Sequence, residues 1–214
     1  MNDPQYNTWT SLKSAFKESN KMQRIILPPY PSIECFNPIP ISDNRVKFPD
    51  VEHIERGLEI HSNCHRYFNN QPEVWTQPKL NRHTYFYGFK QYIVPKITHF
   101  YKSEFDFVDK IHRFKGRCDA LVSFEGKVSL TDWKTTLKPI KSVAKEISVL
   151  DLFQLVAYYC SLQHDESLYI EAIKIEQLRL CYLLYDGSVC LKTFNLSSLE
   201  YCISRWKTFL NSYC

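Results

Sequence analysis

Short runs of strand-forming residues follow one another through the second half of the chain. They span residues 104–112, 117–124, 127–133, 169–176, 178–185 and 188–194. Asp186-Gly187 stands between the last two runs, and this dipeptide favours a hairpin. The stretch from Leu150 to Gln163 is largely apolar and long enough for a buried helix. The pattern therefore predicts strands and helices mixed within one domain.

Amphipathic helices are predicted before and after these strands. Asp50 would cap the first helix, and its apolar stripe would consist of residues spaced three and four apart: Val51, Ile54, Leu58 and His61. The last helix would begin at Ser197, where Ser197-x-x-Glu200 forms a capping box. Its core face would be formed by four apolar residues: Leu199, Ile203, Trp206 and Leu210.

The N-terminal segment differs in composition from the rest. Residues 28–49 contain six of the eleven prolines, which favours extended or looped backbone. Residues 1–49 are therefore predicted to be an irregular, proline-rich extension, and residues 50–214 a single mixed α/β domain. Spaced basic residues between 13 and 24 faintly resemble a mitochondrial presequence, but Asp3 and Glu18 argue against one. A surface helix or a frayed tail is the alternative interpretation.

Composition limits the class of protein. The 214 residues are 44% hydrophobic and 23% charged, as in ordinary globular domains. No apolar stretch reaches the roughly 18 residues that a membrane span requires, so no membrane partner is predicted. The net charge of +4 permits a polyanionic partner without requiring one. The eight cysteines include no CxxC pair, and we expect reduced, mostly buried thiols.

The segment from Arg117 to Lys134 contains the most informative chemistry. Two strand-like runs, 118–124 and 127–133, are separated only by Glu125-Gly126. A two-residue hairpin would pair positions whose numbers sum to 251, which sets Asp119 opposite Asp132. Opposed like charges destabilise a sheet, so the pair indicates either a solvated edge or a bound divalent cation.

The position of Lys134 favours a bound cation over a solvated edge. Side chains alternate along a strand, so Asp132 and Lys134 project to the same side, with Trp133 on the other. An ammonium group there could orient an attacking water molecule. On the following helix, Gln154 and Tyr158 lie four residues apart and share one face, where a buried glutamine needs a polar partner. For His61, a packed core histidine is the default alternative to a metal ligand.

Residues 82–117 combine basic and aromatic side chains. Eight Lys/Arg face three acids, with ten aromatic residues interleaved. Basic groups bind backbone phosphates and aromatic rings stack on unpaired bases, and the combination is typical of proteins that bind single strands. Many of these rings could instead form the core, and this alternative remains open. Lys138, Lys141 and Lys145 form a second basic run.

Taken together, four motifs resemble the RecB-like branch of the PD-(D/E)xK nucleases, and within it the family of mitochondrial genome maintenance exonucleases. They occur in the order typical of that branch and cover roughly residues 50–214: Gly57-x-x-x-His61, Gly116-x-x-Asp119, Asp132-Trp133-Lys134-Thr135 and Gln154-x-x-x-Tyr158. The resemblance implies a restriction-endonuclease-like core with a mixed β-sheet flanked by helices. It also implies a metal-dependent exonuclease that acts on single-stranded DNA ends in DNA replication or repair.

The resemblance assigns a role to each motif residue. It implies Asp119, Asp132, the Trp133 carbonyl and His61 as ligands of Mg²⁺ or Mn²⁺. Lys134 would position the water, while Gln154 and Tyr158 would support Lys134 and the substrate. Some relatives hold an iron–sulfur cluster, but the late cysteines here are spaced 9, 12 and 12 residues apart, so no cluster is expected.

Several properties rest on the resemblance alone or remain open. We expect single-stranded DNA as the partner of a monomer, in the mitochondrion; relatives also occur in viruses and bacteria, which leaves a viral or bacterial setting as the alternative. Two other functions also remain open: a catalytically silent DNA-binding protein of the same fold, and a site-specific endonuclease.

Overall fold

A mixed six-stranded sheet forms the centre of the molecule. The computed structural model describes residues 6–19, 32–36, 53–76, 82–165 and 174–213. The strand order is β1-β6-β5-β4-β3-β2, and only β4 and β5 are parallel neighbours. The strands are β1 (Ser32–Phe36), β2 (Ile97–Asp109), β3 (Phe114–Phe124), β4 (Lys127–Thr136), β5 (Gln177–Leu184) and β6 (Val189–Asn195). The predicted fold class, a mixed sheet flanked by helices, is confirmed.

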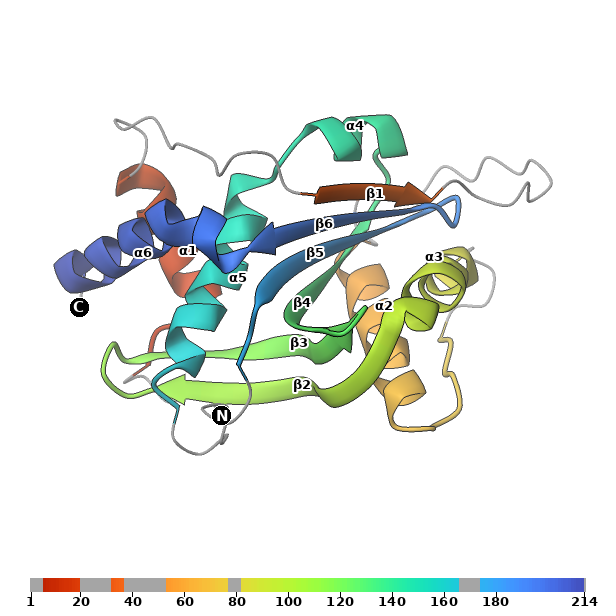
Figure 1. Ribbon diagram of the computed structural model, residues 1–214, viewed down its shortest axis with the longest axis horizontal. Helices are drawn as coiled ribbons and strands as arrows, with labels where there is room; N and C mark the ends of the chain where they lie inside the picture. The colour runs from red at the N-terminus through yellow and green to blue at the C-terminus, as the bar shows by residue number, and fades with distance from the viewer. Residues whose placement is uncertain (1–5, 20–31, 37–52, 77–81, 166–173, 214) are drawn as a thin grey trace.

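Helices cover both faces of this sheet. On one face lie α1 (Trp9–Ser19), α5 (Val149–Leu162) and α6 (Glu200–Tyr213); on the other lie α2 (His53–Phe68) and α3 (Arg82–Gly88), as Figure 1 shows. Each face has its own hydrophobic cluster, the first around Trp206 and the second around Trp133. A short helix, α4 (Ile140–Lys145), and α5 form the crossover that two parallel strands require. None of the described helices has the length and apolar content of a membrane-spanning segment.

Most of the predicted core elements are present. Helix α5 matches the predicted buried helix, and the β3–β4 hairpin has the predicted register, with Val122 opposite Ser129 and Phe124 opposite Lys127. Glu125 and Gly126 both have positive φ angles, 51° and 83°, as a type I′ turn requires. The last helix begins with a 3₁₀ turn at Leu196, and its predicted face is buried at Leu199, Trp206 and Leu210. Six of the seven described cysteines are buried, and Cys35 is exposed.

The predicted apolar stripe of the first helix is wrong. Ile54 and Leu58 are 63% and 68% exposed, whereas the buried face of α2 includes Arg56, Ile60 and Asn63. The polar Asn63 can be buried because its amide nitrogen donates to the Val74 carbonyl at 2.9 Å and its amide oxygen accepts from the Val74 N–H at 2.8 Å. Hydropathy spacing alone cannot detect such pairing. The predicted cap Asp50 and Val51 lie outside the described residues.

Two other expectations also need correction. The N-terminal segment is not irregular throughout: it contributes α1, whose Trp9, Leu12 and Phe16 are buried, and the edge strand β1. Aromatic side chains explain the docking of α1, because the ring centroids of Phe16 and of Phe153 in α5 are 4.6 Å apart. The strand expected over 169–176 is not present at residues 174–176, and the rest of it lies outside the described residues. The domain boundary at residue 50 stays a prediction.

Candidate metal-dependent nuclease site

The sheet divides at the predicted site. Strands β3 and β4 pair only from Ala120–Thr131 to the turn. Beyond this point β3 continues beside β2, while β4 continues beside β5 to Thr136. The ladder therefore ends one pair before Asp119 and Asp132, and each aspartate begins one arm of a fork between β3 and β4 (Figure 1).

Asp119 connects the two arms of the fork to α2. Its Oδ2 accepts a 2.7 Å hydrogen bond from the Trp133 backbone N–H, and its Oδ1 lies 3.3 Å from His61 Nδ1. Burial alone would raise the pKa of Asp119, but His61, Lys134 and the Trp133 N–H together outweigh burial and hold the pKa below its usual value. Burial lowers the pKa of His61, but Asp119 and the carboxylates nearby raise it overall to about 9. The site therefore holds an anion at Asp119 and a cation at His61.

Glu104 is part of this site, although the sequence did not reveal it. The pairs Ser103–Ala120 and Phe105–Cys118 flank it, so its position on β2 is opposite Asp119. His61, Glu104 and Asp119 place one ligand atom each within 4.8 Å of one another. Glu104 has a φ angle of 47°, a left-handed conformation that is costly for a residue other than glycine. Such strain is concentrated at functional sites.

A chain of polar contacts extends from the other arm of the fork to α5. Lys134 Nζ forms an ion pair with Asp132 Oδ2 at 2.8 Å and donates to Gln154 Oε1 at 2.9 Å. Gln154 Nε2 in turn donates to Tyr158 Oη at 3.0 Å. Burial raises the pKa of Asp132 to about 7, and the Asp119 charge adds to this effect. Burial opposes the charge on Lys134, but Asp132 outweighs it and the pKa of Lys134 is raised.

The structure thus brings most of the predicted residues together. Asp132, Lys134, Gln154 and Tyr158 form one chain of contacts on one arm of the fork. On the other arm Asp119 contacts the Trp133 N–H and His61 of α2. The Trp133 side chain points away from the fork, into the second core cluster. There its ring centroid lies 5.4 Å from that of Phe89. Only its backbone is available to the site, in keeping with the implied role of its carbonyl.

The basic and aromatic stretch is mostly structural. Of its ten rings, six are buried: Tyr85, Phe86, Phe89, Phe105, Phe107 and Phe114. Several cations in it are also paired within the protein: Arg82 with Glu59, Lys90 with Glu73, Lys96 with Glu34 and Glu125, and Arg117 with Asp106. The alternative left open by the sequence, that many of these rings form the core, is confirmed.

The donor set suits a divalent cation. Three carboxylates from Glu104, Asp119 and Asp132 surround the fork, and oxygen ligands of this kind are those that Mg²⁺ and Mn²⁺ prefer. Glu104 Oε1 is buried and has no hydrogen-bond partner among the described residues, although His61 Nδ1 lies 3.8 Å from it. A buried carboxylate oxygen without a donor is costly, and a cation would remove that cost. Bound there, a divalent cation would supply Lewis-acid polarisation of a phosphoryl oxygen and lower the pKa of an attacking water.

A divided mixed sheet with carboxylates and a lysine at the fork defines a metal-dependent nuclease core. The family model of the PD-(D/E)XK nuclease superfamily matches residues 55–189, more than half of the chain. The chain therefore belongs to the PD-(D/E)XK nuclease superfamily. A comparison with curated proteins gives no match.

Alanine substitution is expected to have opposite effects on stability at two motif glycines. A Cβ at Gly116 would lie 2.7 Å from Phe107 Cζ and 3.0 Å from Tyr158 Cε1, closer than packed atoms allow. A Cβ at Gly57 would meet only Thr135 Oγ1, at an ordinary 3.8 Å. We expect Gly116→Ala to lower the free energy of unfolding by about 1–3 kcal/mol. Because Gly57 lies inside α2, Gly57→Ala should raise it by up to about 1 kcal/mol.

Urea denaturation followed by circular dichroism measures both effects. Gly116→Ala should also slow nucleic-acid cleavage, because Tyr158, one of the two rings that the new methyl group crowds, carries the hydroxyl bound to Gln154. Equal stability of Gly116→Ala and the wild type would contradict the packing described around Tyr158.

Proposed function

We propose that this protein is a Mg²⁺- or Mn²⁺-dependent exonuclease that hydrolyses phosphodiester bonds of single-stranded DNA from free ends. The observation that carries the proposal is the fork itself, with a buried Asp132 and a partly buried Asp119 on diverging strands and with Lys134 Nζ 2.8 Å from Asp132. Repulsion between buried carboxylates costs stability, so a protein that only binds DNA gains nothing from this arrangement. The intact set therefore favours catalysis over the silent DNA-binding alternative.

We assign to Lys134 the role of a hydrogen-bond donor. Its pKa is raised, so its ammonium stays charged at neutral pH and cannot act as a base. A fixed cation beside the reacting phosphate would orient the attacking water and stabilise negative charge in the transition state. Gln154 and Tyr158 are positioning residues, because the amide holds Nζ and the tyrosine hydroxyl holds the amide. In-line attack of water would leave a 5′-phosphate and a 3′-hydroxyl.

The ligand set of the proposal consists of Asp119, Asp132, the Trp133 carbonyl and His61, with Glu104 as an addition from the structure. His61 and Glu104 are included because each places a ligand atom within 4.8 Å of a ligand atom of Asp119. In the metal-free protein His61 carries a proton because its pKa is raised to about 9, and direct ligation would release that proton.

A hollow beside the fork supports access of a strand to Lys134. It has a volume of about 410 Å³, and its lining includes Lys134, Thr135, Lys138, Asp151 and Tyr182. Lys138 pairs with Glu146 at 2.9 Å, but both side chains are more than 60% exposed. Exposed ion pairs contribute little stability, so a DNA phosphate could replace Glu146 at small cost.

The biological setting that we propose rests on the similarity of the motifs. The four motifs, in their order, are similar to those of the mitochondrial genome maintenance exonucleases, and this similarity supports a role in mitochondrial DNA replication or repair. We propose a monomer that acts there on single-stranded DNA. Imaging of the tagged full-length chain together with a mitochondrial marker tests the compartment.

The activity is tested with single-stranded DNA labelled separately at each end, as linear and as circular molecules. We expect Mg²⁺ or Mn²⁺ to support digestion of linear strands only, and chelation by EDTA to stop it. The two labels report the direction of digestion. An RNA strand of equal sequence shows whether the protein digests DNA in preference to RNA. Cutting of the circular strand would support the endonuclease alternative instead. Tight binding without any digestion would support the silent DNA-binding alternative.

A further inference from the structure

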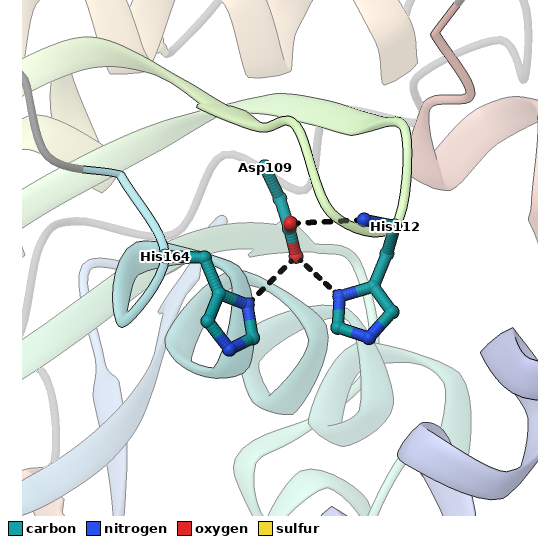
Figure 2. Close-up of side chains that lie close together, drawn as sticks. All are labelled: Asp109, His112 and His164. Atoms are coloured by element: carbon teal, nitrogen blue, oxygen red, sulfur yellow. Dashed lines mark hydrogen bonds and ion pairs between the residues drawn. The ribbon is translucent and has the colours of Figure 1, made fainter.

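A second cluster of ligand-type side chains lies at the far end of the β2–β3 hairpin. Asp109 is the last residue of β2, His112 is in the following turn, and His164 lies two residues beyond the end of α5. Figure 2 shows both imidazole rings directed at the same carboxylate. Asp109 Oδ2 lies 2.8 Å from His112 Nδ1 and 3.1 Å from His164 Nδ1.

The three atoms already approximate a metal-binding geometry. All lie within 4.8 Å of one another, and they come from two segments of the chain, the tip of the β2–β3 hairpin and the end of α5. Tetrahedral Zn²⁺ with bonds of roughly 2.0–2.1 Å places its ligands about 3.3 Å apart, close to the 2.8 and 3.1 Å that separate Asp109 Oδ2 from the two histidine Nδ1 atoms. Outward movement of the two rings would open the space between them and Oδ2.

The surroundings of the carboxylate support the same conclusion. The Asp109 side chain is only 1% exposed, and its other oxygen, Oδ1, accepts a 3.1 Å hydrogen bond from the His112 backbone N–H. This bond fixes the orientation of the carboxylate, as supporting contacts do at metal sites. The two imidazoles are 19% and 26% exposed, so a cation and a water molecule have access from solvent.

This cluster is separate from the nuclease site. Asp109 lies five residues beyond Glu104 on the same strand, a distance of about 16 Å at the usual strand rise. The ligand chemistry also differs. The fork offers mainly carboxylates, which suit Mg²⁺ or Mn²⁺, whereas two imidazoles and one carboxylate suit Zn²⁺.

We propose that Asp109, His112 and His164 form a second metal centre, which binds Zn²⁺ through Asp109 Oδ2 and the two histidine Nδ1 atoms. The ion ties the tip of the β2–β3 hairpin to the C-terminal end of α5. A neighbouring contact joins the same two elements, since Asp165 Oδ2 accepts a 2.7 Å hydrogen bond from the Val108 N–H. Because α5 carries Gln154 and Tyr158, the metal centre stabilises the helix that positions Lys134. It leaves one coordination position for water.

Equilibrium Zn²⁺ binding to the full-length, chelator-treated protein tests the proposal, with a chromogenic chelator as competitor. An Asp119→Asn background weakens binding at the fork and isolates the second site. We expect this protein to bind one equivalent of Zn²⁺ and the added substitution His164→Gln or His112→Gln to weaken binding roughly tenfold or more. His99→Gln, which changes an exposed histidine of β2, is the control and should bind as before.

A second readout separates loss of the site from loss of the fold. Zn²⁺ should raise the melting temperature of the background protein and of the His99→Gln control but not of the His164→Gln variant, whose metal-free circular dichroism should match that of the background. Unchanged Zn²⁺ affinity after His164→Gln and His112→Gln would overturn the proposal. So would a background protein that binds no Zn²⁺, in which case Asp109 would only accept hydrogen bonds from the two histidines.

Discussion

Replacing Lys134 with alanine is expected to slow DNA cleavage by about 10²–10⁴-fold while DNA affinity changes little. The ammonium contacts Asp132 and Gln154 at the fork, and we have assigned it a role in the transition state. A group of this kind contributes to the chemical step more than to ground-state binding. The effect should therefore appear in the rate at saturating substrate.

The fold should tolerate this substitution. Without its ammonium partner, Asp132 can take up a proton, because burial already raises its pKa to about 7. Single-turnover cleavage of end-labelled DNA and a melting curve measure the two effects. Lys13→Ala, on the exposed side of α1, is the matched control and should cleave as the wild type does. Normal cleavage by the Lys134→Ala variant would refute the assignment of Lys134.

Replacing Asp119 with asparagine is expected to remove metal-dependent activity, with a fall of about 10²–10³-fold or more. The asparagine oxygen can still accept the Trp133 N–H bond, so the fork should keep its shape. The lost charge removes an anionic ligand and the partner of His61. For the wild type, Mn²⁺ should raise the melting temperature because a ligand that binds only the folded state stabilises it. The Asp119→Asn variant should show little or no such rise.

Asp106→Asn is the matched control for this experiment. Asp106 is also an aspartate of the β2–β3 hairpin, but its side chain is 69% exposed and pairs with Arg117. We expect the activity of the Asp106→Asn variant and its stabilisation by Mn²⁺ to match those of the wild type. An Asp119→Asn variant that Mn²⁺ stabilises as strongly as the wild type would show that the cation binds elsewhere.

The hairpin between β3 and β4 was predictable because two local rules fix it. The Glu125-Gly126 turn sets the register, and the alternation of side chains then places Asp132 and Lys134 on one face. The four-residue spacing on α5 likewise placed Gln154 and Tyr158 together. These inferences need only neighbouring residues, which is why the sequence was sufficient.

Other parts of the site depend on long-range packing that local pattern does not encode. Glu104 lies at the fork because β2 pairs with β3 in a register that places it opposite Asp119. The buried face of α2 includes Arg56 and Asn63, so hydropathy selected the wrong side of the helix. The aromatic residues of 82–117 were ambiguous for a related reason, since composition does not distinguish a ring in the core from a ring on the surface.

The fork between β3 and β4 is expected to bind the cation that cleavage requires. Anomalous diffraction from crystals soaked in Mn²⁺ locates this cation. We expect an anomalous peak in contact with the carboxylates of Asp119 and Asp132. Absence of a peak at these two residues, in crystals of protein whose cleavage depends on Mn²⁺, would contradict it.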